Sequence, residues 1–151
     1  MRKLLLLTFQ LMPLLWVISC ADDPDCDQEL PYDAVHVGFY DYDSLTKTEL
    51  KFDLVATEGS DSLFYDRSDT LAVFKLNLNP SVDSVTYLFV TGVTIDSLKL
   101  KYSRKLEWLS EKCGPTMSYD RLEIVEHTFD SVSLVQPLID LSVDENIKIY
   151  N

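Results

Sequence analysis

The sequence predicts an all-β fold, an antiparallel β-sandwich of about eight or nine strands over residues 33–151. Apolar and polar residues alternate along most segments of this region, which places one set of side chains on a core face and the other in water. β-Branched and aromatic residues are frequent in the same segments, and no segment has the apolar spacing of a convincing helix. An immunoglobulin-like Greek key fits this pattern, and a closed barrel is the alternative.

The alternation predicts individual strands in order along the chain. It is clearest at residues 50–54, 74–78, 98–102 and 147–149. Further β-rich segments cover residues 34–40, 63–65, 85–90, 116–125 and 132–135. The segment from Leu106 to Lys112 is predicted to be a turn, because Cys113-Gly114-Pro115 follows it.

Residues 1–19 are predicted to be a secretory signal peptide. Arg2 and Lys3 precede an apolar segment that is too short to span a bilayer, since a spanning helix needs about 20 apolar residues. The ending Val17-Ile18-Ser19-Cys20 resembles a bacterial lipobox. This resemblance implies that Cys20 is the first residue of the mature protein and carries a lipid.

The mature chain has the size of one domain and is strongly acidic. Removing residues 1–19 from the 151 leaves 132 residues, with 11 basic and 25 acidic side chains and a net charge of −14. This charge disfavours binding to nucleic acid, because its phosphates require clustered cations on the protein. It also disfavours electrostatic docking on an anionic membrane, so we expect the lipid at Cys20 to provide membrane attachment.

Residues 20–32 are predicted to be an acidic, lipid-anchored tether. The tether begins with Ala21-Asp22-Asp23, which resembles the export tag of Bacteroidetes lipoproteins on the outer face of the outer membrane. The resemblance implies an outer-membrane location. A plain spacer on the periplasmic face is the alternative, and the sequence leaves the face open.

Two cysteines remain once Cys20 carries lipid, namely Cys26 and Cys113. Exported cysteine pairs usually form disulfides. A bridge here would connect residues 87 positions apart in the sequence and stabilise the fold by roughly 4–5 kcal/mol. Cys113 precedes a predicted strand, so we expect it to be a fixed point of the core. A redox or metal-binding pair is the alternative, but no histidine nearby completes a zinc-site spacing, and no metal is predicted.

Three short segments connect the chain to a known family. They are Tyr102-Ser103-Arg104, Cys113-Gly114 and the last strand at residues 147–150. Together with Cys20 and Cys26, they resemble an uncharacterised family of small Bacteroidetes lipoproteins, a domain of unknown function. The resemblance supports the lipid and the disulfide and implies no activity.

Catalytic patterns are weak. His36 and His127 are the only histidines, each next to apolar or acidic strand residues, and no Gly-x-Ser-x-Gly elbow is present. Glycoside hydrolysis needs two carboxyl groups at a set separation in a cleft, which an abundance of acidic residues does not establish. The four glycines form no phosphate-binding loop, so no cofactor is predicted.

Two features suggest a ligand contact. Tyr40-Asp41-Tyr42-Asp43 alternates aromatic rings and carboxylates, which could stack on a sugar or offer oxygens to Ca²⁺. A polar turn is the alternative, because the glycine and distal glutamate of a calcium loop are missing. Trp108 is expected in a loop, where it either caps the core or marks a contact surface.

The sequence therefore predicts a lipid-anchored protein of the cell envelope with a binding or structural role and no catalysis. Its partners would be the membrane, through Cys20, and an envelope protein or glycan. One rival is a glycan-active enzyme, which requires a cleft with converging carboxylates. The other is an adhesin or assembly partner that offers an exposed strand edge or apolar patch.

Overall fold

The computed structural model describes residues 34–59, 63–66, 70–139 and 143–151, and the predicted signal peptide and tether lie outside them. The described strands are β1 (Ala34–Tyr40), β2 (Leu50–Lys51), β3 (Leu54–Thr57), β4 (Leu63–Asp66), β5 (Thr70–Leu71), β6 (Val73–Asn77), β7 (Ser84–Thr91), β8 (Thr94–Ser110), β9 (Gly114–His127), β10 (Ser131–Leu134) and β11 (Ile147–Tyr150). No helix occurs in these ranges.

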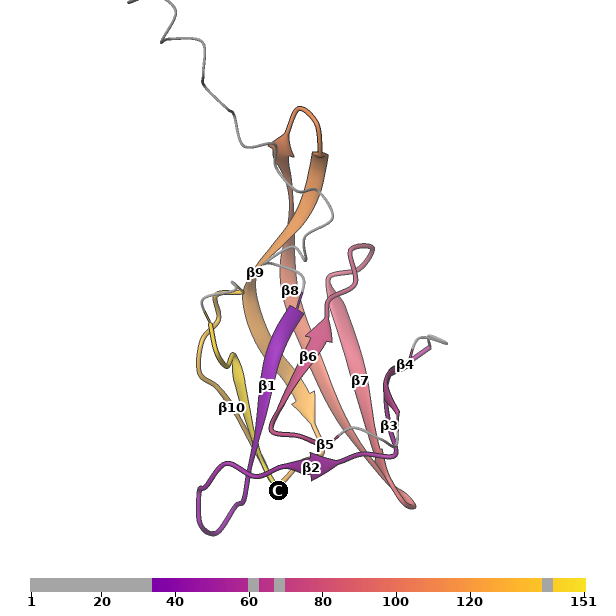
Figure 1. The fold of residues 1–151 in the computed structure, drawn as a ribbon, viewed down its shortest axis with the longest axis vertical. Helices are drawn as coiled ribbons and strands as arrows, with labels where there is room; N and C mark the ends of the chain where they lie inside the picture. The colour runs from indigo at the N-terminus through magenta and orange to yellow at the C-terminus, as the bar shows by residue number, and fades with distance from the viewer. Residues whose placement is uncertain (1–33, 60–62, 67–69, 140–142) are drawn as a thin grey trace, which may run out of the picture.

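The strands build a sandwich, which confirms the predicted all-β fold (Figure 1). One sheet has the order β10-β11-β1-β6, the other has the order β4-β3-β7-β8-β9, and β2 pairs separately with β5. The predicted strand at residues 50–54 is divided between β2 and β3. The division falls where Phe52 enters the core and the Asp53 N–H donates to the Val90 carbonyl at 2.7 Å, which moves the chain onto the five-stranded sheet.

One strand pair departs from the predicted antiparallel arrangement. β1 is antiparallel to β6 on one side but parallel to β11 on the other, from Val37 opposite Ile147 to Tyr40 opposite Tyr150. β10 is antiparallel to β11, and residues 135–146 connect the two strands. Only after this connection does β11 take its place in the sheet beside β1. The position of β11 therefore depends on how this connection is fixed.

Asn146 fixes the connection at the start of β11. Its side chain is 1% exposed, its Oδ1 accepts from the His36 N–H at 2.9 Å, and its backbone N–H donates to the His36 carbonyl at 2.8 Å. Its Nδ2 donates to the carbonyls of Gln136, at 3.1 Å, and Leu138, at 2.7 Å. Asn146, at the end of the connection, thus joins the start of the connection to β1. Every polar atom of its buried side-chain amide has a partner.

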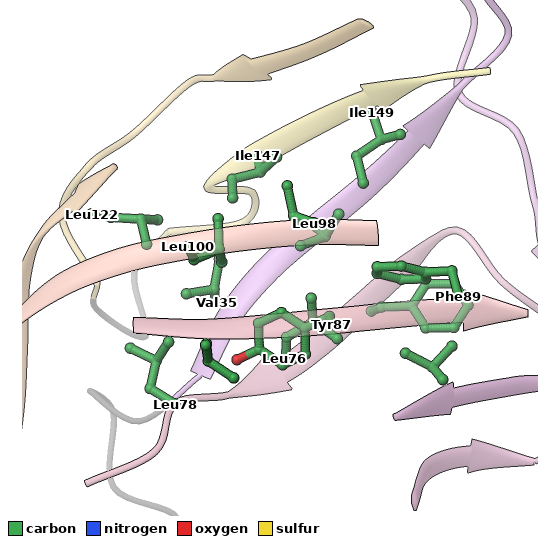
Figure 2. Close-up of a cluster of buried hydrophobic side chains, with 14 of the residues drawn as sticks. Val35, Leu76, Leu78, Tyr87, Phe89, Leu98, Leu100, Leu122, Ile147 and Ile149 are labelled. Carbon is green, nitrogen blue, oxygen red and sulfur yellow. The ribbon is translucent and has the colours of Figure 1, made fainter. Parts of the chain in front are cut away.

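The core lies between the two sheets and has an aromatic centre. The Phe39 ring from β1 lies 5.1 to 6.2 Å, centroid to centroid, from the rings of Phe52, Phe74, Phe89 and Phe129. Three of these four contacts are edge-to-face, the arrangement that the ring quadrupole favours. Figure 2 shows aliphatic side chains filling the rest of the space, among them Val35, Leu76, Leu98, Leu100, Ile147 and Ile149.

The hairpin of β8 and β9 extends beyond the sandwich. β7 pairs with β8 only up to Lys101, opposite Ser84, and beyond that point β8 pairs with β9 alone in the described part of the chain. We call residues 103–120 the arm, and Figure 1 shows it standing away from both sheets. The turn predicted for residues 106–112 is wrong for its first five residues, because β8 continues to Ser110 and the turn covers residues 111–113.

Replacement of Asn146 should destabilise the whole sandwich. Asn146→Ala leaves the His36 N–H and the carbonyls of Gln136 and Leu138 without their partner, so we expect the free energy of unfolding to fall by about 2–4 kcal/mol. Urea denaturation measures this difference. Asn77→Ala, at an exposed asparagine of β6, is the control and should change stability by less than about 0.5 kcal/mol. Equal effects of the two substitutions would contradict the role of Asn146.

Candidate functional site

A polar cluster lies on the outer face of the four-stranded sheet, around Glu145. Alternation along β1 directs Val35, Val37 and Phe39 into the core, so Tyr40 lies on the opposite face. The Tyr40 hydroxyl donates to Glu145 Oε2 at 2.7 Å, and Lys47 Nζ lies 2.7 Å from Glu145 Oε1. The carboxylate side chain is only 11% exposed. Oε2 accepts the hydrogen bond of Tyr40, whereas the buried Oε1 has the Lys47 charge beside it but no hydrogen bond.

A glycine makes room for this carboxylate. A Cβ atom added at Gly38 would lie 1.8 Å from Glu145 Oε1 and 2.4 Å from its Cδ, which is far inside contact distance. Gly38 is also in the middle of β1, where glycine otherwise weakens a strand. The glycine is therefore explained by the close approach of the Glu145 side chain to the sheet.

The cluster is built to hold a charge in place. Burial and the hydrogen bond to Glu145 raise the pKa of Tyr40 to about 12. Lys148 Nζ lies 4.7 Å from the centroid of the Tyr40 ring, and the Tyr150 ring packs 5.6 Å from it. A tyrosine with so high a pKa is poorly matched to proton transfer at neutral pH. The arrangement is that of a structural ion pair on the sheet face.

The sequence-predicted segment Tyr40-Asp41-Tyr42-Asp43 is divided by this packing. Tyr40 belongs to the Glu145 cluster, whereas Asp41 and Asp43 lie in the exposed turn that follows β1. The Asp41 carboxylate accepts from the Ser44 N–H at 2.7 Å, and this hydrogen bond lowers the pKa of Asp41. Tyr42 is exposed. The two carboxylates thus lie in a polar turn, and the ligand contact of the four side chains stays a prediction.

The described residues offer little for a metal or for paired carboxylates. They contain no group of three or more His, Cys, Asp or Glu side chains placed to hold a metal ion. A hollow of about 250 Å³ near the β7–β8 turn has a single acidic side chain in its lining, Asp96, whose Oδ1 already accepts from the Thr128 hydroxyl at 2.9 Å. Glycoside hydrolysis by the usual mechanism needs two carboxyl groups, and this lining supplies one.

Both histidines contact backbone carbonyls. His36 Nδ1 lies 2.7 Å from the Val143 carbonyl and His127 Nδ1 lies 3.1 Å from that of Phe129. A carbonyl only accepts hydrogen bonds, so Nδ1 carries the proton in each ring. His36 lies between the core residues Val35 and Val37 on the outer face of β1, where it is half-buried.

The arm carries the most exposed apolar surface near its tip. The register pairs Leu106 with Met117 and Trp108 with Pro115 on one face. Leu106 is 66% exposed and Trp108 is 68% exposed. We call these four residues the apolar stripe. The predicted loop position of Trp108 is wrong, because Trp108 lies within β8, where its exposed side chain does not cap the core.

The opposite face of the arm is polar. It presents Ser103, Lys105 and Glu107 from β8, opposite Asp120, Ser118 and Thr116 from β9. Lys105 Nζ pairs with Glu107 Oε1 at 2.6 Å, and their hydrogen bond raises the pKa of Lys105 and lowers that of Glu107. The arm is thus an amphipathic two-stranded ribbon, with the apolar stripe on one face and these polar side chains on the other.

The base of the arm is braced on the sandwich. Tyr102 exchanges hydrogen bonds of 3.0 Å with the backbone of Asn79 and packs edge-to-face on Tyr119, with ring centroids 5.4 Å apart. Arg104 pairs with Asp83 and donates to the Pro80 carbonyl at 2.8 Å. Since the loop between β6 and β7 covers the base of this face, the exposed part of the stripe begins at Leu106.

Cys113 lies at the far end of the arm. It is the last residue of the turn between β8 and β9, and its N–H donates to Ser110 Oγ at 2.9 Å. The expectation that Cys113 is a fixed point of the core is therefore wrong, because the strands beside it have left the sandwich. Cys20 and Cys26 lie outside the described residues.

Some residues of these two regions escape sequence reasoning. Glu145 carries no local signal, because its partners Tyr40 and Lys47 lie 105 and 98 residues away in the sequence. The arm does have a local sequence signal. The polar and apolar alternation of residues 98–102 continues through Lys105, Leu106, Glu107 and Trp108. That continuation predicts a longer strand.

The comparisons with known proteins identify a family and no activity. A model of a family of unknown function, DUF6452, matches residues 53–151, well over half of the chain. The matched region contains the whole arm and Cys113, and it begins after β1. No curated protein and no solved structure matches. Among the described residues, no helix is long and apolar enough to cross a membrane.

The pKa of Tyr40 predicts a pH dependence of stability. Because folding raises this pKa from 10.0 to about 12, the hydrogen bond to Glu145 contributes fully below pH 10 and is lost as the pH rises from 10 to 12. Tyr40→Phe should lose about 1–2 kcal/mol at neutral pH. It should then lose less further stability than the wild type between pH 10 and 12. Urea denaturation across this range checks both effects, and parallel pH profiles for the two proteins would refute them.

Proposed function

The chain belongs to the family of unknown function DUF6452, and we propose that this protein is a lipid-anchored lipoprotein of the bacterial outer membrane with a binding role and no catalysis. We further propose that the family is one of small Bacteroidetes lipoproteins. The basic start, the short apolar segment and the lipobox-like ending at Cys20 support the anchor. The acidic residues after Cys20 support display on the outer face.

The exposed apolar stripe is the observation that carries the binding role. Large apolar side chains on a projecting element mark contact surfaces, and Leu106 and Trp108 are two-thirds exposed. The buried Glu145 carboxylate, by contrast, is paired with Tyr40 and Lys47 and is held inside a structural cluster. A glycan-active enzyme would need a second converging carboxylate, which the lining of the hollow at Asp96 does not supply.

The bridge between Cys26 and Cys113 is part of the proposal. Cys113 is a disulfide-bonded cysteine, and the chain contains only two others, Cys20 and Cys26. Since lipid on Cys20 would use its sulfur, Cys26 is the partner that stays available. The bridge would join the tether to the tip of the arm and not to the core.

The anchor is tested by phase partition in a detergent that separates on warming. The wild-type protein should enter the detergent phase because of its lipid, and Cys20→Ser should move to the aqueous phase with its signal peptide uncleaved. Cys26→Ser is the matched control and should stay in the detergent phase. Unchanged partition of Cys20→Ser would refute the anchor.

The bridge is tested by counting thiols in protein purified from the envelope. Unfolded without reductant, it should contain no free cysteine thiol. Loss of the bridge in Cys26→Ala with Cys113→Ala should lower the free energy of unfolding by a few kcal/mol, roughly 4–5 at most, because the unfolded chain gains freedom. Two reactive thiols in the wild type would contradict the bridge and return the pair to a redox or metal-binding interpretation.

A further inference from the structure

The apolar stripe has a direction relative to the anchor. The last pair of the arm is Ser110 with Gly114, and the pair of Trp108 with Pro115 comes directly before it. At a rise of about 3.3 Å per residue, Trp108 therefore lies roughly 7 Å along the strand from the tip. The stripe is thus at the end of the molecule that carries Cys113.

The proposed bridge sets the distance between this tip and the membrane. Five residues lie between Cys20 and Cys26, so the six Cα–Cα steps that join them span at most about 22 Å when fully extended. The headgroup layer of a bilayer extends several ångströms beyond its hydrocarbon core. A lipid on Cys20 and a disulfide from Cys26 to Cys113 would together keep the arm tip within one short tether length of the interface.

The charge distribution favours the same orientation. The arm is neutral, with the cations Arg104, Lys105 and Lys112 and the anions Glu107, Glu111 and Asp120. The net charge of −14 of the mature chain therefore lies entirely outside the arm. Five of the acidic residues lie in the tether, which its lipid would hold at the membrane, and the sandwich carries the remaining −9. An anionic membrane surface repels the sandwich and does not repel the arm, so of these two parts the arm tip is the one that can approach it.

We infer that the apolar stripe seats in the interfacial layer of the membrane in which Cys20 is anchored, with Trp108 and Leu106 facing the lipid. The inference rests on the proposed anchor and bridge. Tryptophan is enriched at membrane interfaces because its ring is amphipathic, and the polar face of Lys105 and Glu107 stays toward water. The arm is then a second, reversible contact that orients the sandwich on the membrane.

The fluorescence of Trp108 can report directly on its surroundings. The chain has two tryptophans, and Trp16 is removed with residues 1–19, so Trp108 is the single tryptophan of the mature protein. Purified lipidated protein is reconstituted into phosphatidylcholine vesicles with bromine atoms on the acyl chains. We expect the Trp108 emission to shift to shorter wavelength and to be quenched by bromine, relative to the same protein in detergent-free buffer after removal of the lipid by proteolysis of the tether.

Matched variants separate a lipid contact from other causes. Leu106→Asp places a charge on the stripe and should abolish most of the quenching, whereas Val93→Asp, at the fully exposed turn before β8, should leave it unchanged. Flotation of the vesicles tests the anchor independently. Protein that floats while Trp108 stays unquenched overturns this inference alone, and protein that does not float contradicts the proposed anchor. A blue-shifted emission without vesicles overturns the inference in favour of a second copy or another protein on the stripe.

Discussion

The parallel pairing of β11 with β1 is the constraint on which the rest of the fold depends. β11 reaches this position only after a connection that the Asn146 amide ties to His36, Gln136 and Leu138. The connection then brings Glu145 over Gly38, where the carboxylate pairs with Tyr40 and Lys47. A buried amide with all its hydrogen bonds made specifies one arrangement, because any other leaves polar atoms without partners.

The protein has two parts with different properties, the sandwich that this pairing completes and the arm. The sandwich buries its apolar residues around Phe39 and holds its buried charge in a fixed ion pair. Among the described side chains of the arm, only Ser118 and Tyr119 are buried, next to Tyr102 at its base. Beyond Lys101, β8 pairs only with β9 in the part of the chain that the structure describes. Few buried contacts make an element more open to local exchange and to partners. We therefore propose that the sandwich gives structural support and that the arm makes the contact.

The sequence predicts the strands well where period-two alternation is strict. β1, β6, β7 and β11 follow directly from it, because one face of each is buried against the opposite sheet. The parallel pairing of β1 with β11 does not follow, since it depends on hydrogen bonds of Asn146 to residues up to 110 positions away. The same distance hides the Glu145 cluster, and Cys113-Gly114-Pro115 led to a turn that was too long. The signal peptide, the lipid and the pairing of Cys26 remain predictions of the sequence.

Hydrogen exchange read by mass spectrometry tests the central claim, that a rigid sandwich carries an arm whose protection depends on the membrane. The mature lipidated protein is compared on vesicles and after removal of its lipid. The account predicts that the amides of His36 and Asn146 exchange slowly in both states, and that the amides of Leu106 to Trp108 become protected only on vesicles. Equal exchange of the arm in the two states, or fast exchange at His36 and Asn146, would contradict it.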